Sequence, residues 1–208
     1  MEPSDACAHI LWLETADSTN SELRRRIAGL DNLSIIAARE QTAGRGQGAH
    51  TWFSSPGKNL TFSILYRFGG KYALAASDAI LITQVTTLAI RDYLLCHGVR
   101  ARIKWPNDIW VEDRKICGIL IENTLESGLV RESIVGIGLN LNETGWPQEL
   151  PNPVSLYELT GKQFEPKTEL VALEKEICRR FGQLASPDGR CSLQEEFGKF
   201  MFRLHGEP

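Results

Sequence analysis

A glycine-rich segment, residues 40–52, carries the residue types best suited to holding an anion. Gly44, Gly46 and Gly48 alternate with Arg45 and a glutamine. Alternate glycines let backbone N–H groups approach a ligand closely, and a guanidinium offers a fixed fork of donors to a carboxylate or phosphate. The segment predicts a loop that orders over a ligand and excludes water. An ordinary flexible surface loop is the alternative, because glycine clusters are first of all turn signals.

Two common nucleotide-binding glycine motifs do not account for this segment. The Gly-Lys pair at 57–58 is followed by asparagine instead of serine or threonine, so the P-loop pattern fails. A G-x-G-x-x-A spacing begins at Gly44, but residues 52–57 cannot open a helix, so the dinucleotide-binding context is missing. The role of this segment therefore has to be inferred from the other motifs in the chain.

Cations, amides and a carboxylate gather at the ends of three expected strands. Together they suit a nucleotide that arrives with Mg²⁺. Taken singly, a hairpin lysine is usually solvated, and a lone aspartate more often caps a turn than holds a metal. Two glycines on one strand face predict the close approach of a ligand or another backbone. The groups are Lys104, Asn107 and Asp108 in Lys-Trp-Pro-Asn-Asp, Arg114 and Lys115 ahead of Gly118, and Asn140 after Gly136 and Gly138.

Ser18 and Thr19 open an expected helix that runs to Gly29. One interpretation is capping alone, with Ser18 as the N-cap. The other is that the hydroxyls and N–H groups at this helix N-terminus also hold a polar group of a ligand.

The composition is typical of a globular protein. The 208 residues suffice for one domain with a full core, and 42% are hydrophobic and 24% charged. A net charge of −3 argues against a surface dominated by nucleic-acid binding. Five scattered cysteines without a Cys-x-x-Cys pair indicate reduced thiols rather than disulfides or a zinc site. With no signal sequence and no apolar run of membrane-spanning length evident, we expect a cytoplasmic protein.

The expected elements place the chemical groups on a sheet with helices. Hairpin connections between several strands predict a mixed sheet rather than a doubly wound one, and therefore an α+β domain. Period-two alternation predicts that the strand at 59–67 is half-buried. The expected strands are 10–13, 33–39, 59–67, 99–104, 109–111, 116–122 and 133–142; the expected helices are 18–29, 73–97, 155–159, 167–184 and 192–204.

Five motifs, in their order along the chain, resemble those of the catalytic domain of the biotin protein ligases. Each is weak alone, but the ordered set over about residues 18–142 is specific. The resemblance implies a mixed, mostly antiparallel sheet packed by helices, like that of class II aminoacyl-tRNA synthetases and biotin ligases. The motifs are Ser18-Thr19-Asn20, Gln41 through Trp52 around Gly44-Arg45-Gly46, Lys104-Trp105-Pro106-Asn107-Asp108, Arg114-Lys115-x-x-Gly118-Ile119-Leu120, and Gly136-x-Gly138-x-Asn140.

The resemblance implies a two-step reaction that uses biotin, ATP and Mg²⁺. The biotin carboxylate attacks the α-phosphate of ATP, which gives biotinyl-5′-AMP and pyrophosphate. A lysine of a biotin carboxyl carrier protein then attacks the mixed anhydride, and no general base for this lysine is assigned. We expect no nucleic-acid or membrane partner, and a homodimer stays open.

Family membership also implies roles for individual residues. Lys115 and Arg45 are the implied catalytic residues, with Lys115 on the carboxylate and the α-phosphate. The implied biotin-binding residues are Ser18, Thr19, Asn20, Gln41, Gly44, Arg45, Gly46, Gln47, Lys115 and Gly118; the nucleotide-binding residues are Trp52, Lys104, Asn107 and Asn140; and the implied magnesium ligand is Asp108.

The chain departs from the family pattern in two ways. Gln47 and His50 stand where basic residues are common, which reduces the loop charge and leaves open how strongly the loop retains the adenylate. The segment before Ser18 is too short for the helix-turn-helix domain of repressor-type members, and the chain stops about where a small C-terminal barrel begins. We therefore expect residues 1–208 to form the catalytic domain, with the barrel absent or truncated.

Two alternative functions remain. A lipoate ligase or octanoyltransferase would share the fold and the acyl-transfer logic, although the Gly-Arg-Gly and Lys-Trp-Pro-Asn-Asp motifs are of the biotin type. A non-catalytic biotin-sensing or DNA-binding regulator is disfavoured by the acidic net charge and by the missing helix-turn-helix.

Overall fold

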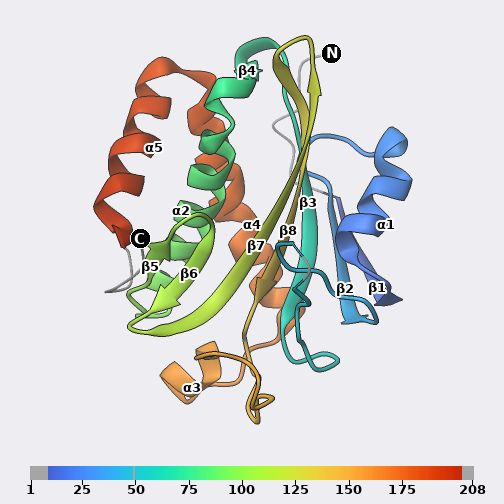
Figure 1. Cartoon of the computed structure of the whole chain (residues 1–208), viewed down its shortest axis with the longest axis vertical. Helices are drawn as coiled ribbons and strands as arrows, with labels where there is room; N and C mark the ends of the chain where they lie inside the picture. The colour runs from blue at the N-terminus through green and yellow to red at the C-terminus, as the bar shows by residue number, and fades with distance from the viewer. Residues whose placement is uncertain (1–8, 49, 203–208) are drawn as a thin grey trace.

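The structure, a computed structural model, describes residues 9–48 and 50–202, which form one sheet flanked by helices (Figure 1). Its strands are β1 (Ile10–Ala16), β2 (Ile35–Gln41), β3 (Leu60–Arg67), β4 (Leu74–Ala75), β5 (Arg102–Lys104), β6 (Asp108–Val111), β7 (Arg114–Glu126), β8 (Leu129–Leu139) and β9 (Met201–Phe202). Its α-helices are α1 (Thr19–Arg26), α2 (Ile80–Cys96), α3 (Leu156–Thr160), α4 (Pro166–Gly182) and α5 (Pro187–Phe200).

The sheet is mixed and mostly antiparallel, which confirms the predicted α+β class. Its strand order is β1-β2-β3-β8-β7-β6-β5-β9, with β4 paired to β8. The pairs β1–β2 and β5–β9 are parallel, and the other pairs are antiparallel. A turn at Ser127-Gly128 joins β7 to β8, and both residues take positive φ values (52° and 79°). Tight turns of this kind are what allow neighbouring strands to run antiparallel.

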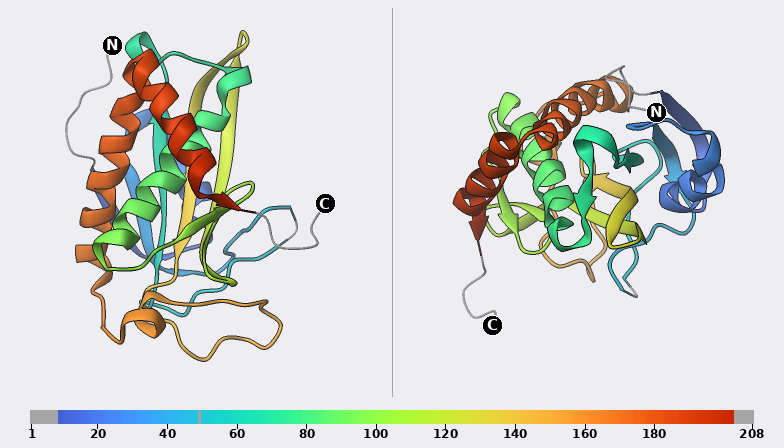
Figure 2. Two further views of the ribbon diagram at one scale, coloured as in Figure 1. Left: turned by 90° about the vertical axis from the view of Figure 1, so that its left-hand side faces the viewer. Right: turned by 90° about the horizontal axis from the view of Figure 1, so that it is seen from above.

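Helices cover both faces of the sheet (Figure 2). Helices α2, α4 and α5 gather on one face, whereas α1 packs against β2, β3 and β8 on the other. The main core therefore lies between the sheet and α2 and α4, and a smaller cluster around Leu23 and Leu65 lies under α1.

Strand β3 is buried on both faces rather than half-buried, because each face of the sheet carries helices. Every residue from Leu60 to Tyr66 is buried. Phe62 and Ile64 belong to the main core, whereas Ser63 faces α1 and satisfies its hydroxyl there by hydrogen bonds. The polar positions of the alternating pattern thus mark a buried polar layer, not a solvent face.

Two predicted helices have different bounds in the structure. The predicted helix at 73–97 begins only at Ile80, since Leu74–Ala75 forms β4 on the edge of β8 and a 3₁₀ turn follows at Ala76–Asp78. The last helix begins at Pro187, five residues earlier than predicted, because Ser186 caps it by accepting from Gly189 N. It ends at Phe200, where the chain becomes β9 beside β5, and its predicted end at 204 lies outside the described residues.

The stretch Ala76–Cys96 is long and apolar enough to cross a membrane by length and composition, contrary to our expectation that no run reaches that length. However, 67% of its most apolar window is buried inside the protein. Helix α2 contacts α4, α5 and β6, so core packing accounts for its apolar surface. Four cysteines among the described residues are free, and Cys7 lies outside those residues.

Candidate functional site

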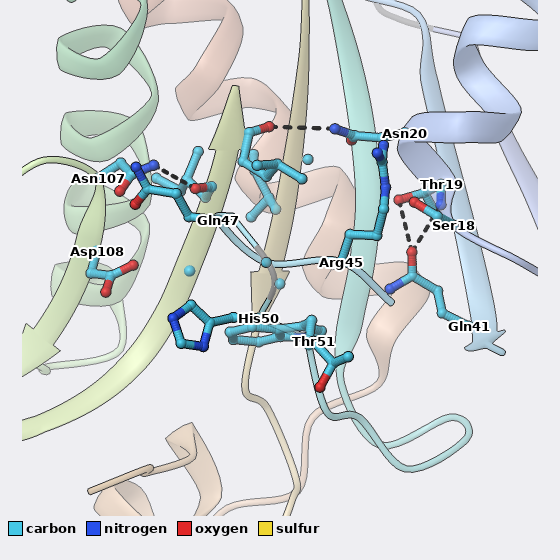
Figure 3. Close-up of a pocket in the computed structure, with 18 of the residues that line it drawn as sticks. Ser18, Thr19, Asn20, Gln41, Arg45, Gln47, His50, Thr51, Asn107 and Asp108 are labelled. Carbon is cyan, nitrogen blue, oxygen red and sulfur yellow. Dashed lines mark hydrogen bonds between the residues drawn. The ribbon is translucent and has the colours of Figure 1, made fainter. Parts of the chain in front are cut away.

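A pocket of about 220 Å³ opens between the N-terminus of α1, the glycine-rich segment and strands β7 and β8 (Figure 3). It collects most of the predicted site residues, although they come from four separate stretches of the chain. Those that line it are Ser18, Thr19, Asn20, Gln41, Arg45, Gly46, Gln47, Trp52, Asn107, Asp108, Lys115 and Gly118.

The glycine-rich segment is an ordered wall of this pocket. Gly46 N donates to His50 O (2.8 Å), and Trp52 N donates to Gly44 O (3.0 Å), which closes a narrow hairpin. Residue 49 lies outside the described part of the hairpin. The segment therefore has internal hydrogen bonds and faces the cavity, as a ligand-binding wall requires, and its closure as a lid stays a prediction.

Hydroxyl and amide groups form one end of the pocket, where α1 begins beside the end of β2. Thr19 N donates to Gln41 Oε1 (2.8 Å), and Thr19 Oγ1 lies 3.2 Å from the same oxygen. A backbone N–H can only donate, so the atom facing it must be Oε1, and the Gln41 Nε2 group is left for a ligand. Ser18 is the N-cap of α1 but makes no capping bond with its side chain. Of the two interpretations of Ser18, ligand binding therefore has the stronger support.

Asn20 has both polar atoms bonded within the protein. Its Nδ2 donates to Glu122 Oε2 (3.0 Å), and its Oδ1 accepts from Ser63 Oγ (2.5 Å). Ser63 is fully buried and also lies 2.8 Å from Thr19 Oγ1. Asn20 thus supports the polar end of the pocket, and its predicted contact with biotin stays a prediction.

A cation occupies the other end of the pocket. Lys115 Nζ forms an ion pair with Asp108 Oδ1 (2.8 Å) and lies 5.7 Å from the centroid of the Trp52 ring. The antiparallel pairing of β6 and β7 brings Lys115 and Asp108 together. The ammonium group is consequently held in place before any ligand binds.

Arg45 lies between the two ends, at the rim. Its Nη2 is 3.2 Å from Glu122 Oε1, and Arg24 Nη2 is 3.3 Å from Glu122 Oε2. The Arg45 side chain is 45% exposed. An ion pair as exposed as this is weak, so an anionic ligand can take the guanidinium from Glu122 at little cost.

The glycines of β7 and β8 make room for side chains; Gly118, Gly136 and Gly138 also line the pocket, so the close approach of a ligand stays a prediction. A Cβ on Gly138 would lie 2.2 Å from the Trp52 ring, and one on Gly118, its partner across the two strands, 2.8 Å from it. A Cβ on Gly136 would lie 2.3 Å from Asn20 Oδ1. The indole therefore lies against two adjacent glycines, and its Nε1 is buried with no partner among the described residues.

Three predicted site residues are not among those that line the pocket. Gly44 lies behind Trp52, whose carbonyl oxygen would be 2.6 Å from a Cβ there. Asn140 donates to Val154 O (3.0 Å), and its buried Oδ1 has no partner in the described chain. Lys104 Nζ lies 4.7 Å from the centroid of the Trp110 ring. Their roles toward a nucleotide stay predictions.

The structure adds a buried carboxylate that sequence reasoning missed. Glu143, whose side chain is 2% exposed, accepts from Ser55 N (2.9 Å) and Asn59 Nδ2 (3.1 Å) and pairs with Lys58 Nζ (3.3 Å). Burial acts to raise the pKa of Glu143, but the donors from Ser55 and Lys58 outweigh it and hold the pKa below its ordinary value. Glu143 thereby fixes residues 55–59, which follow Trp52 closely. A lone glutamate after Asn140 carries no sequence signal for this role.

The described residues contain no group of three or more His, Cys, Asp and Glu placed to hold a metal ion. Asp108, the predicted magnesium ligand, is paired with Lys115. Mg²⁺ commonly binds through one or two carboxylates plus substrate phosphates. The donor set therefore fits magnesium only as an ion that arrives with a nucleotide, with Asp108 as a single protein ligand.

Comparison with known families agrees with this arrangement of groups. Residues 12–140, more than half of the chain, match the model of the biotin/lipoate A/B protein ligase family. The chain belongs to this family. The matched region contains both ends of the pocket, the glycine-rich segment and the strands that carry Lys115 and Asp108.

Several relatives in the family are named as biotin ligases. The bifunctional ligase/repressor BirA of Escherichia coli is 36% identical over 129 residues, which is 62% of this chain and 39% of BirA. The biotin–[acetyl-CoA-carboxylase] ligase of Paracoccus denitrificans is 36% identical over 181 residues, 83% of this chain and 72% of that protein. The chain thus spans about two fifths of the length of the BirA relatives.

Solved structures show the same fold. The biotin protein ligase of Aquifex aeolicus, in complex with biotin and ATP, has a TM-score of 0.78 at 27% identity, covering 93% of this chain and 78% of that one. The Leishmania major biotin protein ligase in complex with biotin has a TM-score of 0.75 at 27% identity, covering 96% and 85%.

Proposed function

We propose that this protein is an ATP-dependent biotin protein ligase. In the first step a biotin carboxylate oxygen attacks the α-phosphorus of ATP. The bond from this phosphorus to the oxygen that bridges to the β-phosphate breaks, pyrophosphate departs, and biotinyl-5′-AMP is formed. In the second step a lysine ε-amine of a carrier protein attacks the acyl carbon and AMP leaves with the electron pair of the C–O bond. The nitrogen releases one proton, and an amide forms. One observation carries the proposal: a single pocket joins a hydroxyl–amide end that matches a urea to a lysine that matches a carboxylate and a phosphate.

The polar end supplies the groups that a cyclic urea needs. A urea presents one carbonyl acceptor and two N–H donors. Gln41 Nε2 can donate to the carbonyl, and the hydroxyls of Ser18 and Thr19 can donate or accept. A binding site that pairs every polar atom of its ligand also rejects ligands that lack those atoms.

The cationic end supplies charge where the first step needs it. The carboxylate and the triphosphate repel each other, and their negative charge concentrates in the transition state. Lys115 is pre-positioned by Asp108, and Arg45 can turn from Glu122 toward the anions. Fixed positive charge of this kind lowers the barrier because it needs no reorganisation during the reaction.

The nucleotide belongs on the side of Trp52, Asn107 and Asp108. Asn107 is held by a bond from its Nδ2 to Ile119 O (2.6 Å). Magnesium, when bound with ATP, would neutralise phosphate charge, and Asp108 is the residue suited to hold it. Lys104 and Asn140 do not line the pocket, and we propose that they contribute to nucleotide binding from just outside it.

The glycine-rich hairpin would protect the adenylate from water. Biotinyl-5′-AMP is a reactive anhydride, and a closed wall excludes water from it. Gln47 and His50 both line the pocket and supply fewer fixed charges than arginines would. We therefore expect the adenylate to leave this pocket faster than from one with an arginine-rich loop.

The carrier lysine is proposed to come from the biotin carboxyl carrier domain of a carboxylase. Support comes from the Paracoccus denitrificans relative, whose name states an acetyl-CoA carboxylase as its substrate.

The decisive assay is biotin-dependent exchange of pyrophosphate into ATP. We expect Lys115→Ala to abolish the exchange, because the ammonium meets both reacting anions. Near-normal exchange in this variant would remove Lys115 from the mechanism.

The same family includes lipoate ligases, so the acid has to be tested directly. Biotin should raise the melting temperature, since a ligand that binds only the native state stabilises it, and lipoate should not. Equal stabilisation by lipoate would favour the lipoyl-transfer alternative.

A further inference from the structure

A chain of hydrogen bonds runs beneath the polar end of the pocket and ends at a charged carboxylate. Asn20 bonds to Glu122 (Nδ2 to Oε2, 3.0 Å) and to Ser63 (Oδ1 to Oγ, 2.5 Å). Ser63 Oγ lies 2.8 Å from Thr19 Oγ1, and Thr19 lines the pocket. The four side chains come from α1, β3 and β7, and Ser63 is fully buried. Solvent therefore has no access to the middle of the chain.

Donor and acceptor chemistry, together with the contact distances, sets the direction of every bond in this chain. An ionised carboxylate accepts only, so the Asn20 atom that faces Glu122 has to be Nδ2. Its Oδ1 is then an acceptor only and takes the single proton of the Ser63 hydroxyl. Because that proton is used, the 2.8 Å contact between Ser63 and Thr19 takes the proton of Thr19, in preference to the longer 3.2 Å contact of the same hydroxyl with Gln41 Oε1. The Thr19 oxygen is left with lone pairs.

We propose that Glu122 and Ser63 are positioning residues that turn the Thr19 hydroxyl into a hydrogen-bond acceptor for a ring N–H of the substrate. This inference rests on the proposed function, since a cyclic urea is what supplies the N–H. Gln41 Oε1 is satisfied by Thr19 N, so it does not need the Thr19 proton. The pocket then presents an acceptor at Thr19 and a donor at Gln41 Nε2, which matches an N–H next to a carbonyl.

The surroundings of the chain support a fixed polarity. Arg24 and Arg45 both lie against Glu122, so its negative charge is balanced while its Oε2 accepts from Asn20. Gly136 has no side chain because Asn20 Oδ1 occupies the position of its Cβ. The amide of Asn20 is thus held against the sheet, and turning it over would place its Nδ2 against the Ser63 proton.

The test combines a protein change with a ligand change. Ser63→Ala removes the group that takes the Thr19 proton, and the ligands are biotin and the two cyclic carbamates in which one ring N–H is replaced by oxygen. The wild-type protein should bind biotin at least tenfold more tightly than one carbamate, whose ring oxygen faces the Thr19 lone pairs. In Ser63→Ala the Thr19 proton can turn to that oxygen, so this preference should shrink about tenfold, the equivalent of one ordinary hydrogen bond.

The matched control is Thr61→Val. Thr61 lies two residues before Ser63 on β3, is also buried, and donates its hydroxyl to Ala38 O (2.8 Å), outside the chain of hydrogen bonds. Loss of the Thr61 hydroxyl should leave the preference for biotin over the carbamate as it is in the wild type. Glu122→Gln provides a second variant if Ser63→Ala does not fold, because an amide in that place can donate to Asn20 and reverse the chain; it should also shrink the preference.

The outcomes separate the two levels of inference. If the wild type binds biotin but Ser63→Ala and Glu122→Gln weaken all three ligands equally, the proton relay is overturned and the proposed function stands. If the wild type does not bind biotin, both fall. A reduced preference in Thr61→Val as large as in Ser63→Ala would also overturn the relay, since it would make the effect a general consequence of lost stability.

Discussion

Replacing Gly138 by alanine should move the Trp52 ring out of its position. The added Cβ would lie 2.2 Å from the ring, whereas ordinary contacts are 3.4–4 Å, so the indole has to retreat by more than 1 Å. The backbone on both sides of Gly138 is bonded to β3 and β7 and cannot yield instead. Overpacking of this kind costs about 1–3 kcal/mol, which corresponds to a roughly 5- to 150-fold loss of the wild-type arrangement.

The consequence should fall on one substrate. Trp52 is assigned to the nucleotide side, so Gly138→Ala should raise the KM for ATP much more than the KM for biotin in pyrophosphate exchange. For Gly136→Ala we expect the opposite: the KM for biotin should rise more than the KM for ATP, because the added Cβ would lie 2.3 Å from Asn20 Oδ1 at the polar end of the pocket. Gly198→Ala is the control: nothing lies within 4 Å of a Cβ there, and alanine favours a helix.

Two results would refute this reasoning. Gly138→Ala and Gly136→Ala could raise the KM of the same substrate, which would mean that the two glycines do not separate a nucleotide side from a biotin side. Alternatively, Gly138→Ala could leave both KM values unchanged with a stable fold, which would show that the Trp52 position does not matter for binding.

Two further predictions concern stability. The pKa of Glu143 is held below its ordinary value of 4.5, chiefly by the hydrogen bond from Ser55 against the opposing effect of burial. The stability that ionised Glu143 contributes is therefore present above pH 4.5 and is lost as the pH falls through the lowered pKa. The melting temperature of Glu143→Gln should depend less on pH below 4.5 than that of the wild type, and parallel curves for the two proteins would contradict this. Arg180, whose side chain is 6% exposed, forms ion pairs with Asp92 (2.6 Å) and Glu196 (2.8 Å) and so links α2, α4 and α5. Arg180→Ala should lower the free energy of unfolding, measured in urea, by about 3 kcal/mol and leave the KM for biotin unchanged. A loss below about 1 kcal/mol would show that the network adds little.

Local pattern in the sequence is enough to define the family motifs, the class of the sheet and most strand positions. Alternation and turn chemistry act over a few residues, so the β7–β8 hairpin and strand β3 are visible without tertiary structure. Helix bounds were less predictable where the sheet edge competes for the chain. Leu74–Ala75 and Met201–Phe202 pair with β8 and β5, and those partners are distant in sequence.

The roles of individual polar side chains were decided only by tertiary structure. Sequence placed Ser18 and Thr19 at a helix start and Lys115 near a strand end, and the structure brings them to one pocket. The sequence alone could not show that Asn20 is hydrogen-bonded to residues 43 and 102 positions away, since hydrogen-bond partners depend on which strands become neighbours. A serine in β3 and a glutamate in β7 have nothing in their local pattern to mark them. Their function arises where α1 crosses the sheet, because only there can a buried hydroxyl and a carboxylate reach the same amide.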